Sequence, residues 1–327
     1  MTSRVPSKEF NSIDLVKFCM AFAVVAIHTH PHYSCSILWV KELLTDVFAL
    51  AVPFFFVASG FLIWNKICDA QKEVQLARLK EWIKKTTRLY IWWTIIYLPF
   101  TIKGFLMDNI GVAKSLIVFM RNFLLVGENY LSWPLWYLLA MLVAAVLVYL
   151  MVKYNFNGHA MCLVGVLLAL IGFCLDRGII QSDTYISLFK TTRNGFFVGL
   201  QYILIGIFIA KKGVIKSKMI LFAMFAASML LHAFGYNMVM FIAIYSFFSL
   251  VLHYHLNATS KTTFQNMRLT SAVVYFVHML WVGVITLLFP NLLSPVLLFS
   301  IVVIMSLLTA VIVIRNQDTD IVKILFK

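Results

Sequence analysis

Residues 13–28 read IDLVKFCMAFAVVAIH, a mostly apolar stretch that contains Lys17 and ends on His28. An apolar stretch whose length as a helix is close to the thickness of a bilayer is typical of a membrane-spanning helix. At roughly 100° per residue, Lys17 and His28 fall on one stripe of that helix, ~16 Å apart along its axis. Charged and titratable groups inside a membrane segment are costly, so they indicate a functional site. The alternative is that Lys17 snorkels at the cytoplasmic end and His28 is interfacial.

The composition of the whole chain excludes a soluble domain. Of its 327 residues, 62% are hydrophobic and 12% are charged, which leaves too little polar sequence to cover a water-exposed surface. The alternating pattern of a membrane β-barrel is absent, so we expect an all-α, polytopic transmembrane bundle. We expect one membrane-embedded domain over residues 1–327, with about ten spans near 13–30, 44–64, 86–106, 134–152, 159–175, 194–210, 217–234, 237–255, 270–289 and 293–314.

The basic residues predict the orientation of these spans. With both termini in the cytoplasm, most of the 27 Lys and Arg residues fall in cytoplasmic loops, as the positive-inside rule requires. Segment 113–126 is short and contains Lys114 and Arg121, so we expect it to be interfacial or re-entrant. The net charge of +14 then reflects topology and contact with membrane lipids, and no nucleic-acid partner is expected.

A basic cluster lies at the end of the longest expected cytoplasmic loop, residues 65–88. Residues 84–93 read KKTTRLYIWW, and Lys85 and Arg88 lie three positions apart on the helix that follows. A pair of cations at the inner membrane surface would suit a phosphate-bearing ligand from the cytoplasm. Ordinary anchoring of the helix by Lys, Arg and Trp is the alternative.

Several motifs occur in a consistent order along the chain. They are IDLVK with VVAIH (13–17 and 24–28), VPFFFVASGFL (52–62), Arg88 with its aromatic followers, PLWYL (134–138), RNGFFVGL (193–200) and VYFVH (274–278). Together they resemble the acyltransferase-3 family, whose first helix carries a basic residue, ten intervening residues and a histidine. The third helix of that family commonly starts with two arginines three apart, whereas this chain has Lys85 and Arg88.

The resemblance implies an integral enzyme of the plasma (inner) membrane. Such enzymes move an acyl group, here expected to be acetyl, from cytoplasmic acyl-CoA to a hydroxyl of an envelope or surface glycan or a lipid-linked saccharide. It implies His28 as the catalytic residue, either a general base or a transient acyl carrier, since histidine titrates near neutral pH. It also implies that Lys17, Lys85 and Arg88 hold the CoA phosphates, with Lys85 lacking the guanidinium fork. Acyl-CoA is then a co-substrate, and no bound cofactor or metal is expected.

Other polar and aromatic residues are candidates for acceptor binding or for lining a passage. His278 lies mid-helix with Tyr275 one turn earlier on the same side, or it bonds a neighbouring helix. Arg193 and Asn194 open a span at its outer end, where they orient an acceptor, stabilise an oxyanion or anchor the helix. Trp136 either stacks on a sugar or belongs to an aromatic belt.

Two other classes of function fit the same composition. A transporter or flippase for a lipid-linked sugar or other envelope precursor would also have about ten spans, although the paired broken helices of such proteins are not evident. A non-catalytic membrane sensor would leave Lys17, His28 and Arg88 unexplained together.

Overall fold

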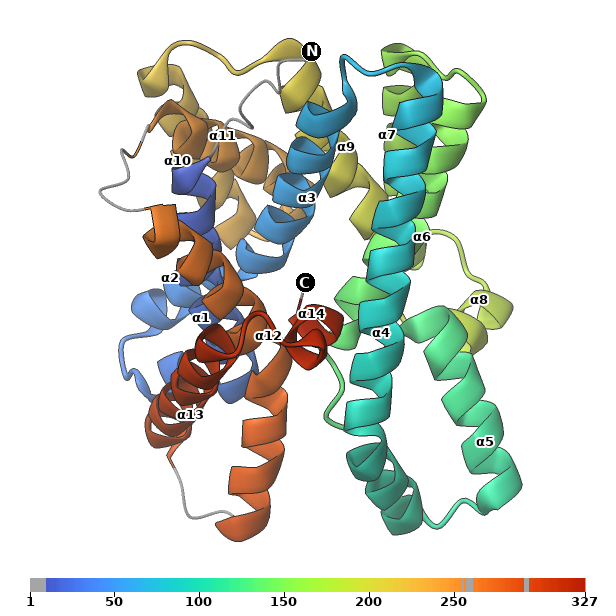
Figure 1. The fold of residues 1–327 in the computed structure, drawn as a ribbon, viewed down its shortest axis with the longest axis vertical. Helices are drawn as coiled ribbons and strands as arrows, with labels where there is room; N and C mark the ends of the chain where they lie inside the picture. Colours follow the sequence, from blue (N-terminus) through green and yellow to red (C-terminus); the bar gives the residue numbers. More distant parts are fainter. Residues whose placement is uncertain (1–9, 255, 257–260, 291–293, 327) are drawn as a thin grey trace.

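The computed structural model describes residues 10–254, 256, 261–290 and 294–326, which are helices and connecting loops throughout (Figure 1). The α-helices are α1 Asn11–Thr29, α2 Leu38–Ala49, α3 Ala51–Ile67, α4 Lys72–Asp108, α5 Val112–Arg121, α6 Leu135–Lys153, α7 Gly158–Asp176, α8 Asp183–Phe189, α9 Leu200–Lys212, α10 Lys218–Ala233, α11 Met240–His253, α12 Lys261–Leu288, α13 Pro295–Arg315 and α14 Asp320–Phe326. Short turns of 3₁₀- or π-helix are η1 Pro31–Ser34, η2 Asn122–Val126, η3 Gly195–Gly199 and η4 Asn237–Val239.

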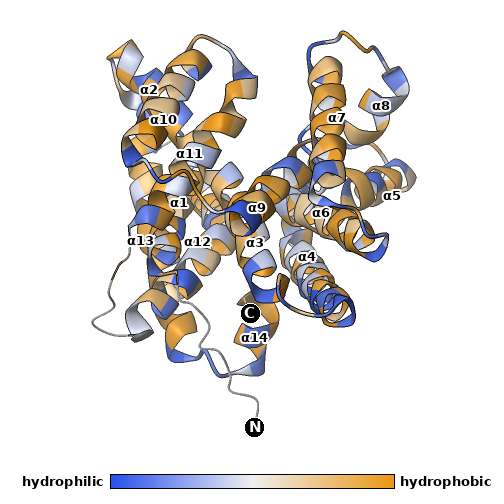
Figure 2. Cartoon of the chain, turned by 90° about the horizontal axis from the view of Figure 1, so that it is seen from above, coloured by the Kyte–Doolittle hydropathy of each residue, from blue (hydrophilic) through white to orange (hydrophobic). Residues whose placement is uncertain are grey.

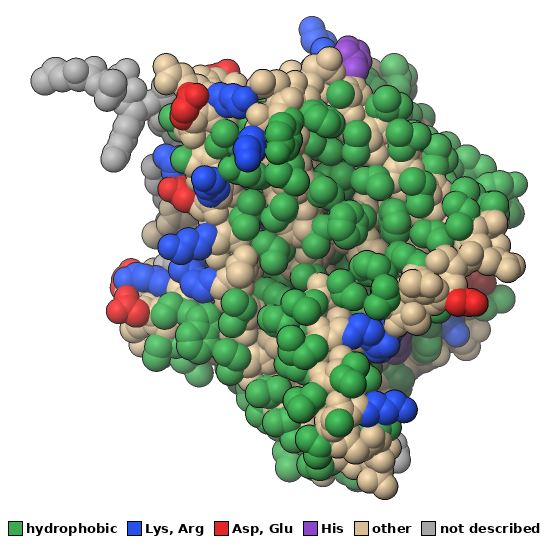
Figure 3. All heavy atoms as spheres, turned by 90° about the vertical axis from the view of Figure 1, so that its right-hand side faces the viewer, with side chains coloured by type: hydrophobic (Ala, Val, Ile, Leu, Met, Phe, Trp, Pro, Cys, Tyr) green, Lys and Arg blue, Asp and Glu red, His purple; other side chains and the backbone are tan. Residues whose placement is uncertain are grey.

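The predicted all-helical membrane architecture is confirmed. Among the described residues, eight helical segments are long and apolar enough to cross a membrane, and α10 and η4–α11 are shorter apolar helices. Hydrophobic side chains cover most of the face in Figure 3, and the charged ones gather mainly along one edge. In Figure 2, seen from above, hydrophobic residues predominate along most of the helices. Lipid is the medium that such a surface requires.

Two segments differ in detail from the sequence prediction. The expected span 44–64 is divided at Leu50 into α2, which has no buried residue, and α3, which is largely buried. The expected loop 65–88 is mostly helical, because α4 begins at Lys72 and runs for 37 residues. At ~1.5 Å per residue this helix is longer than a bilayer is thick, so the basic cluster lies on a helix that projects beyond the membrane.

Segment 113–126 forms α5 and η2, and it is not among the helices long enough to cross. In Figure 1 α5 lies beside the lower part of α4. The side chain of Arg121, at the end of α5, donates a hydrogen bond of 3.1 Å to the backbone oxygen of Ser187 in α8. The expected ends 255 and 293 of two other spans lie outside the described residues.

Glycines allow α3 and α9 to pack with their backbones in contact. A Cβ atom at Gly206 would lie 2.1 Å from the carbonyl oxygen of Val57, and one at Gly60 would lie 2.2 Å from that of Ile203. Both distances are far below a normal contact, so only glycine fits at either position. Small residues at helix interfaces are the usual means by which membrane helices approach closely.

The end of the described chain returns to the middle of the molecule. Helix α14 lies beside α4 (Figure 1), where the indole nitrogen of Trp93 donates a hydrogen bond to the oxygen of Leu325 at 2.9 Å. The Trp93 ring also stacks on Phe276 of α12, with centroids 4.8 Å apart. These contacts join α4, α12 and α14 around the cavity described next.

Candidate active site

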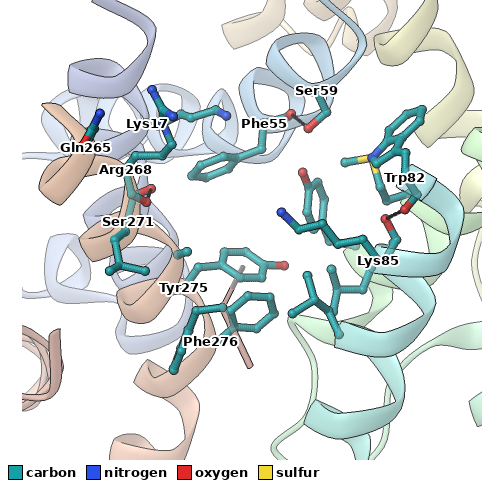
Figure 4. A pocket seen from close by; sticks show the side chains of 18 of the residues that line it. Lys17, Phe55, Ser59, Trp82, Lys85, Gln265, Arg268, Ser271, Tyr275 and Phe276 are labelled. Carbon is teal, nitrogen blue, oxygen red and sulfur yellow. Dashed lines mark hydrogen bonds between the residues drawn. The ribbon is translucent and has the colours of Figure 1, made fainter. Parts of the chain in front are cut away.

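A cavity of about 560 Å³ lies between α1, α3, α4, α6 and α12, and we call it the central cavity. Its polar lining includes three cations, Lys17, Lys85 and Arg268, together with Ser59, Gln265 and Gln317. Its aromatic lining includes Phe55, Tyr137, Tyr275, Phe276 and Phe326. Figure 4 shows Lys17 and Arg268 on one wall and Lys85 reaching in from the opposite wall. The cavity therefore combines a concentrated positive charge with an aromatic interior.

One carboxylate holds Arg268 in place at the wall. The guanidinium of Arg268 donates two hydrogen bonds to the carboxylate of Asp14, from Nε to Oδ1 at 2.9 Å and from Nη2 to Oδ2 at 2.5 Å. The Asp14 side chain is 4% exposed and that of Arg268 is 56% exposed, so the carboxylate is enclosed while the guanidinium still faces the cavity. A two-point contact of this kind restricts the orientation of a guanidinium as well as its position.

Three aromatic rings from three helices converge in the cavity. The centroid of Tyr275 lies 5.5 Å from that of Tyr137 and 6.0 Å from that of Phe55, and Phe55 lies 6.3 Å from Tyr137. The Tyr275 hydroxyl donates a hydrogen bond to the Pro134 carbonyl oxygen at 2.6 Å, which ties α12 to the start of α6. These rings restrict the width of the cavity at this point.

Two histidines lie next to Tyr275, outside the set of described residues that line the central cavity. The His278 ring is 6.3 Å from the Tyr275 ring and 5.3 Å from the His28 ring, measured between centroids. The ring of Trp133 stacks on His28 from another direction, with centroids 6.0 Å apart and an interplanar angle of 28°. Helices α1 and α12, which pack closely along their lengths, thus bring His28 and His278 together.

The remaining sequence candidates lie around the start of α6 and of η3. Asn194 caps η3, since its side-chain oxygen accepts hydrogen bonds from the backbone N–H groups of Phe196 and Phe197. The guanidinium of Arg193 lies 5.8 Å from the ring centroid of Trp136, a cation–π arrangement. Burial raises the pKa of the nearby Glu128 carboxyl, and the charges of Arg193 and Lys190 oppose that shift.

Comparison with known proteins assigns most of the chain to a family. The model of a family described as an acyltransferase domain matches residues 10–315. The chain belongs to the acyltransferase-3 family. The matched range includes both histidines and all three cavity cations of this acyltransferase. The resemblance inferred from its motifs is thereby confirmed.

The curated relatives of the chain are named as racemases. The chain is 29% identical over 274 residues to an amino-acid racemase of Enterococcus faecalis, covering 76% of the chain and 36% of the relative. It is 28% identical over 275 residues to a serine/alanine racemase of Enterococcus gallinarum, covering 76% and 38%. The chain thus spans little more than a third of the length of these two relatives. No solved structure matches it.

The donor-binding candidates occupy two different environments in the acyltransferase. Lys17 and Lys85 line the central cavity, on opposite walls. Arg88, three residues after Lys85, is exposed and donates a hydrogen bond to the backbone oxygen of Lys323 in α14, at 3.3 Å. Arg88 therefore lies beside the cavity rather than among the residues that line it.

Sequence reasoning missed three residues that shape this site. Arg268 is not among the residues singled out from the sequence, although it lines the cavity from α12. Asp14, an acid in a mostly apolar span, was a usable signal, because such a group requires a partner. Tyr137 lies within the motif PLWYL, but nothing in its spacing distinguishes a cavity residue from a packing residue.

Proposed function

We propose that this acyltransferase transfers an acetyl group from acyl-CoA on the cytoplasmic side to a hydroxyl of an envelope or surface glycan or of a lipid-linked saccharide. The observation that carries the proposal is the order of groups along one direction: three cations line the central cavity, aromatic rings converge at its wall, and a pair of histidines lies next to those rings. A donor with phosphates at one end and a thioester at the other matches that order of groups.

The cations provide the expected contacts for the donor phosphates. Lys17 and Lys85 approach from opposite walls as point charges, and Arg268 adds a planar guanidinium already oriented by Asp14. Arg88 adds positive charge beside the cavity, next to α14. The pantetheine arm would then extend past Tyr137 and Tyr275 and bring the thioester toward His28.

The narrowing at Phe55, Tyr137 and Tyr275 supports a small acyl group. Ring centroids 5.5 to 6.3 Å apart leave little width between the ring surfaces. An acyl group that reaches these rings would have to displace packed side chains, and the free energy that this costs increases with the size of the group. Acetyl is the smallest common acyl group carried by coenzyme A.

His28 is the proposed catalytic residue. As a general base it takes the proton of the acceptor hydroxyl, whose oxygen attacks the thioester carbonyl carbon. The carbon–sulfur bond breaks, and the imidazolium returns the proton to the sulfur, which leaves coenzyme A as the free thiol. In the alternative route the imidazole itself takes the acyl group and then yields it to the hydroxyl. Both routes convert acyl-CoA and the acceptor hydroxyl into the acylated acceptor and free coenzyme A.

The proposed topology places donor and acceptor on opposite sides of a plasma membrane. With both termini in the cytoplasm, Lys17 and Lys85 lie toward the inner surface, and His28, Trp133, Trp136 and Arg193 lie toward the outer surface. An aromatic ring can stack on the apolar face of a sugar, and a nearby cation can donate hydrogen bonds to the sugar hydroxyls. The acyl group would thus cross the membrane within the bundle.

The test is transfer of label from acetyl-CoA in membranes that contain the intact protein. We expect label in the extracted glycan or lipid-linked saccharide fraction, and none when His28→Ala is expressed at the same level. His159→Ala is the matched control, because His159 is an exposed histidine at the start of α7. Accumulation of an unlabelled envelope precursor across the membrane, without acyl transfer, would support a transporter instead.

A small amino acid is a second candidate acceptor. One relative is named a serine/alanine racemase, and the serine hydroxyl is a nucleophile of the same kind as a sugar hydroxyl. The same assay with added serine distinguishes the two acceptors, because O-acetylserine is soluble and the glycan product stays in the envelope fraction.

A further inference from the structure

His278 is the most completely enclosed titratable group beside the site. Its side chain is 0% exposed, and it lies in the buried part of α12. Its Nδ1 atom lies 3.0 Å from the backbone oxygen of Val274. Because a carbonyl oxygen can only accept, Nδ1 must carry the hydrogen of the neutral ring. The other nitrogen, Nε2, therefore presents a lone pair.

The lone pair of Nε2 has no hydrogen-bond partner among the residues that the structure describes. Buried polar atoms are almost always paired, so an orphaned acceptor in a membrane helix requires an explanation. Packing alone does not supply one, because an apolar side chain of similar volume would fill the same space without an unpaired group.

A group close to His278 that could donate to Nε2 is the ring of His28. Two imidazole rings joined by an N–H···N hydrogen bond have centroids about 5 Å apart, because the bond is about 3 Å long and each nitrogen lies about 1 Å from its ring centre. The centroids of His28 and His278 are 5.3 Å apart. A reorientation of the more exposed His28 side chain that turns one of its ring nitrogens toward Nε2 would therefore form the bond with the ring centres at nearly their present separation.

We infer that His278 is a positioning residue that accepts a hydrogen bond from His28 and so selects the tautomer of His28 that presents a lone pair to the acceptor hydroxyl. The hydrogen bond to the backbone of α12 fixes the orientation of His278, and Trp133 stacks on the His28 ring from another direction. An acceptor on one nitrogen fixes the tautomer of an imidazole, as the carboxylate does in hydrolase triads. The inference rests on the proposed function, since it assigns His28 its reactive nitrogen.

Two substitutions separate positioning from packing. His278→Gln keeps an acceptor oxygen close to the place of Nε2, whereas His278→Leu keeps much of the volume without any acceptor. We expect His278→Leu to lower kcat about 100-fold with the KM for acetyl-CoA within twofold of the wild type. We expect His278→Gln to recover most of that loss. Ser306→Ala is the control, since it also removes a buried, unpartnered polar atom and should leave kcat unchanged.

A second readout does not depend on acyl transfer. Diethyl pyrocarbonate modifies the lone-pair nitrogen of neutral histidine, and mass spectrometry of the solubilised full-length protein measures the rate at His28. We expect modification of His28 to slow several-fold in His278→Leu and to return toward the wild-type rate in His278→Gln. If the intact protein transferred no acetyl group, the proposed function would fail while this measurement still decided the role of His278.

Two results would overturn the inference. The first is a His278→Leu protein with the wild-type kcat and the wild-type rate of His28 modification. The second is an equal loss of kcat in both His278 variants, which would indicate that the ring contributes shape rather than an acceptor.

Discussion

The carboxylate of Asp14 and the guanidinium of Arg268, 254 positions apart in the chain, form a two-point ion pair at the wall of the central cavity. Asp14 lies in the first turn of α1, and Arg268 lies on α12, so the pair also joins the two helices that carry His28 and His278. One contact thus serves both the helix packing and the orientation of a cation toward the proposed donor.

Asp14→Asn should weaken donor binding more than it lowers the rate of chemistry. The amide keeps the shape of the side chain and loses the charge, so Arg268 would no longer be held by two charge-assisted hydrogen bonds. We expect the KM for acetyl-CoA to rise about tenfold with a smaller change in kcat, measured by steady-state acetyl transfer. Glu81→Gln is the control, because it breaks an exposed ion pair with Arg78 on α4. A changed kcat at unchanged KM would contradict this role.

Arg268→Ala and Arg88→Ala should differ in their effect on the donor. Arg268 lines the cavity, whereas Arg88 donates to the Lys323 backbone beside it. We therefore expect the larger rise in KM for acetyl-CoA from Arg268→Ala, and a smaller rise from Arg88→Ala. Competition by coenzyme A and by its dephosphorylated form, measured on both variants, would show whether phosphate contacts are lost. The opposite ranking would place the donor phosphates toward α14.

Tyr137→Ala should broaden the range of acyl groups that the enzyme accepts. Removing this ring opens the narrow part of the cavity between Phe55 and Tyr275. We expect the ratio of kcat/KM for butyryl-CoA over acetyl-CoA to rise about tenfold, since one or two methylenes in a pocket change discrimination by about that factor. Tyr154→Ala, an exposed tyrosine just after the end of α6, is the control. An unchanged ratio would mean that the rings do not contact the acyl group.

Gly206→Ala should destabilise the bundle without touching the site. The added methyl group would lie 2.1 Å from the Val57 carbonyl oxygen, so α3 and α9 would have to separate. We expect a loss of about 2 kcal/mol or more in stability, seen as a lower midpoint of thermal unfolding in detergent. Gly158→Ala is the matched control, because a Cβ atom there meets nothing within 4 Å. Equal midpoints for the two variants would show that the helices tolerate the separation.

Local sequence predicted the membrane helices well because their main requirement is local. A spanning segment needs about 20 apolar residues, whatever its neighbours are, and that property can be counted along the chain. The same reasoning failed at residues 72–85, where polar residues were expected to form a loop. Lys, Glu, Gln, Leu and Arg are good helix formers in water, so α4 extends beyond the membrane with no apolar signal to show it.

Helical periodicity also placed Lys17 and His28 on one helix and Tyr275 and His278 on another. It could not pair the two helices, because contacts between membrane helices depend on packing and on a few polar bonds, not on hydropathy. The pairing of Asp14 with Arg268, the approach of His278 to His28 and the convergence of Tyr137 on Tyr275 each join residues from different helices. The residue types and their helices thus follow from the sequence, whereas the site follows from how α1, α6 and α12 pack, because side chains far apart in the chain meet only there.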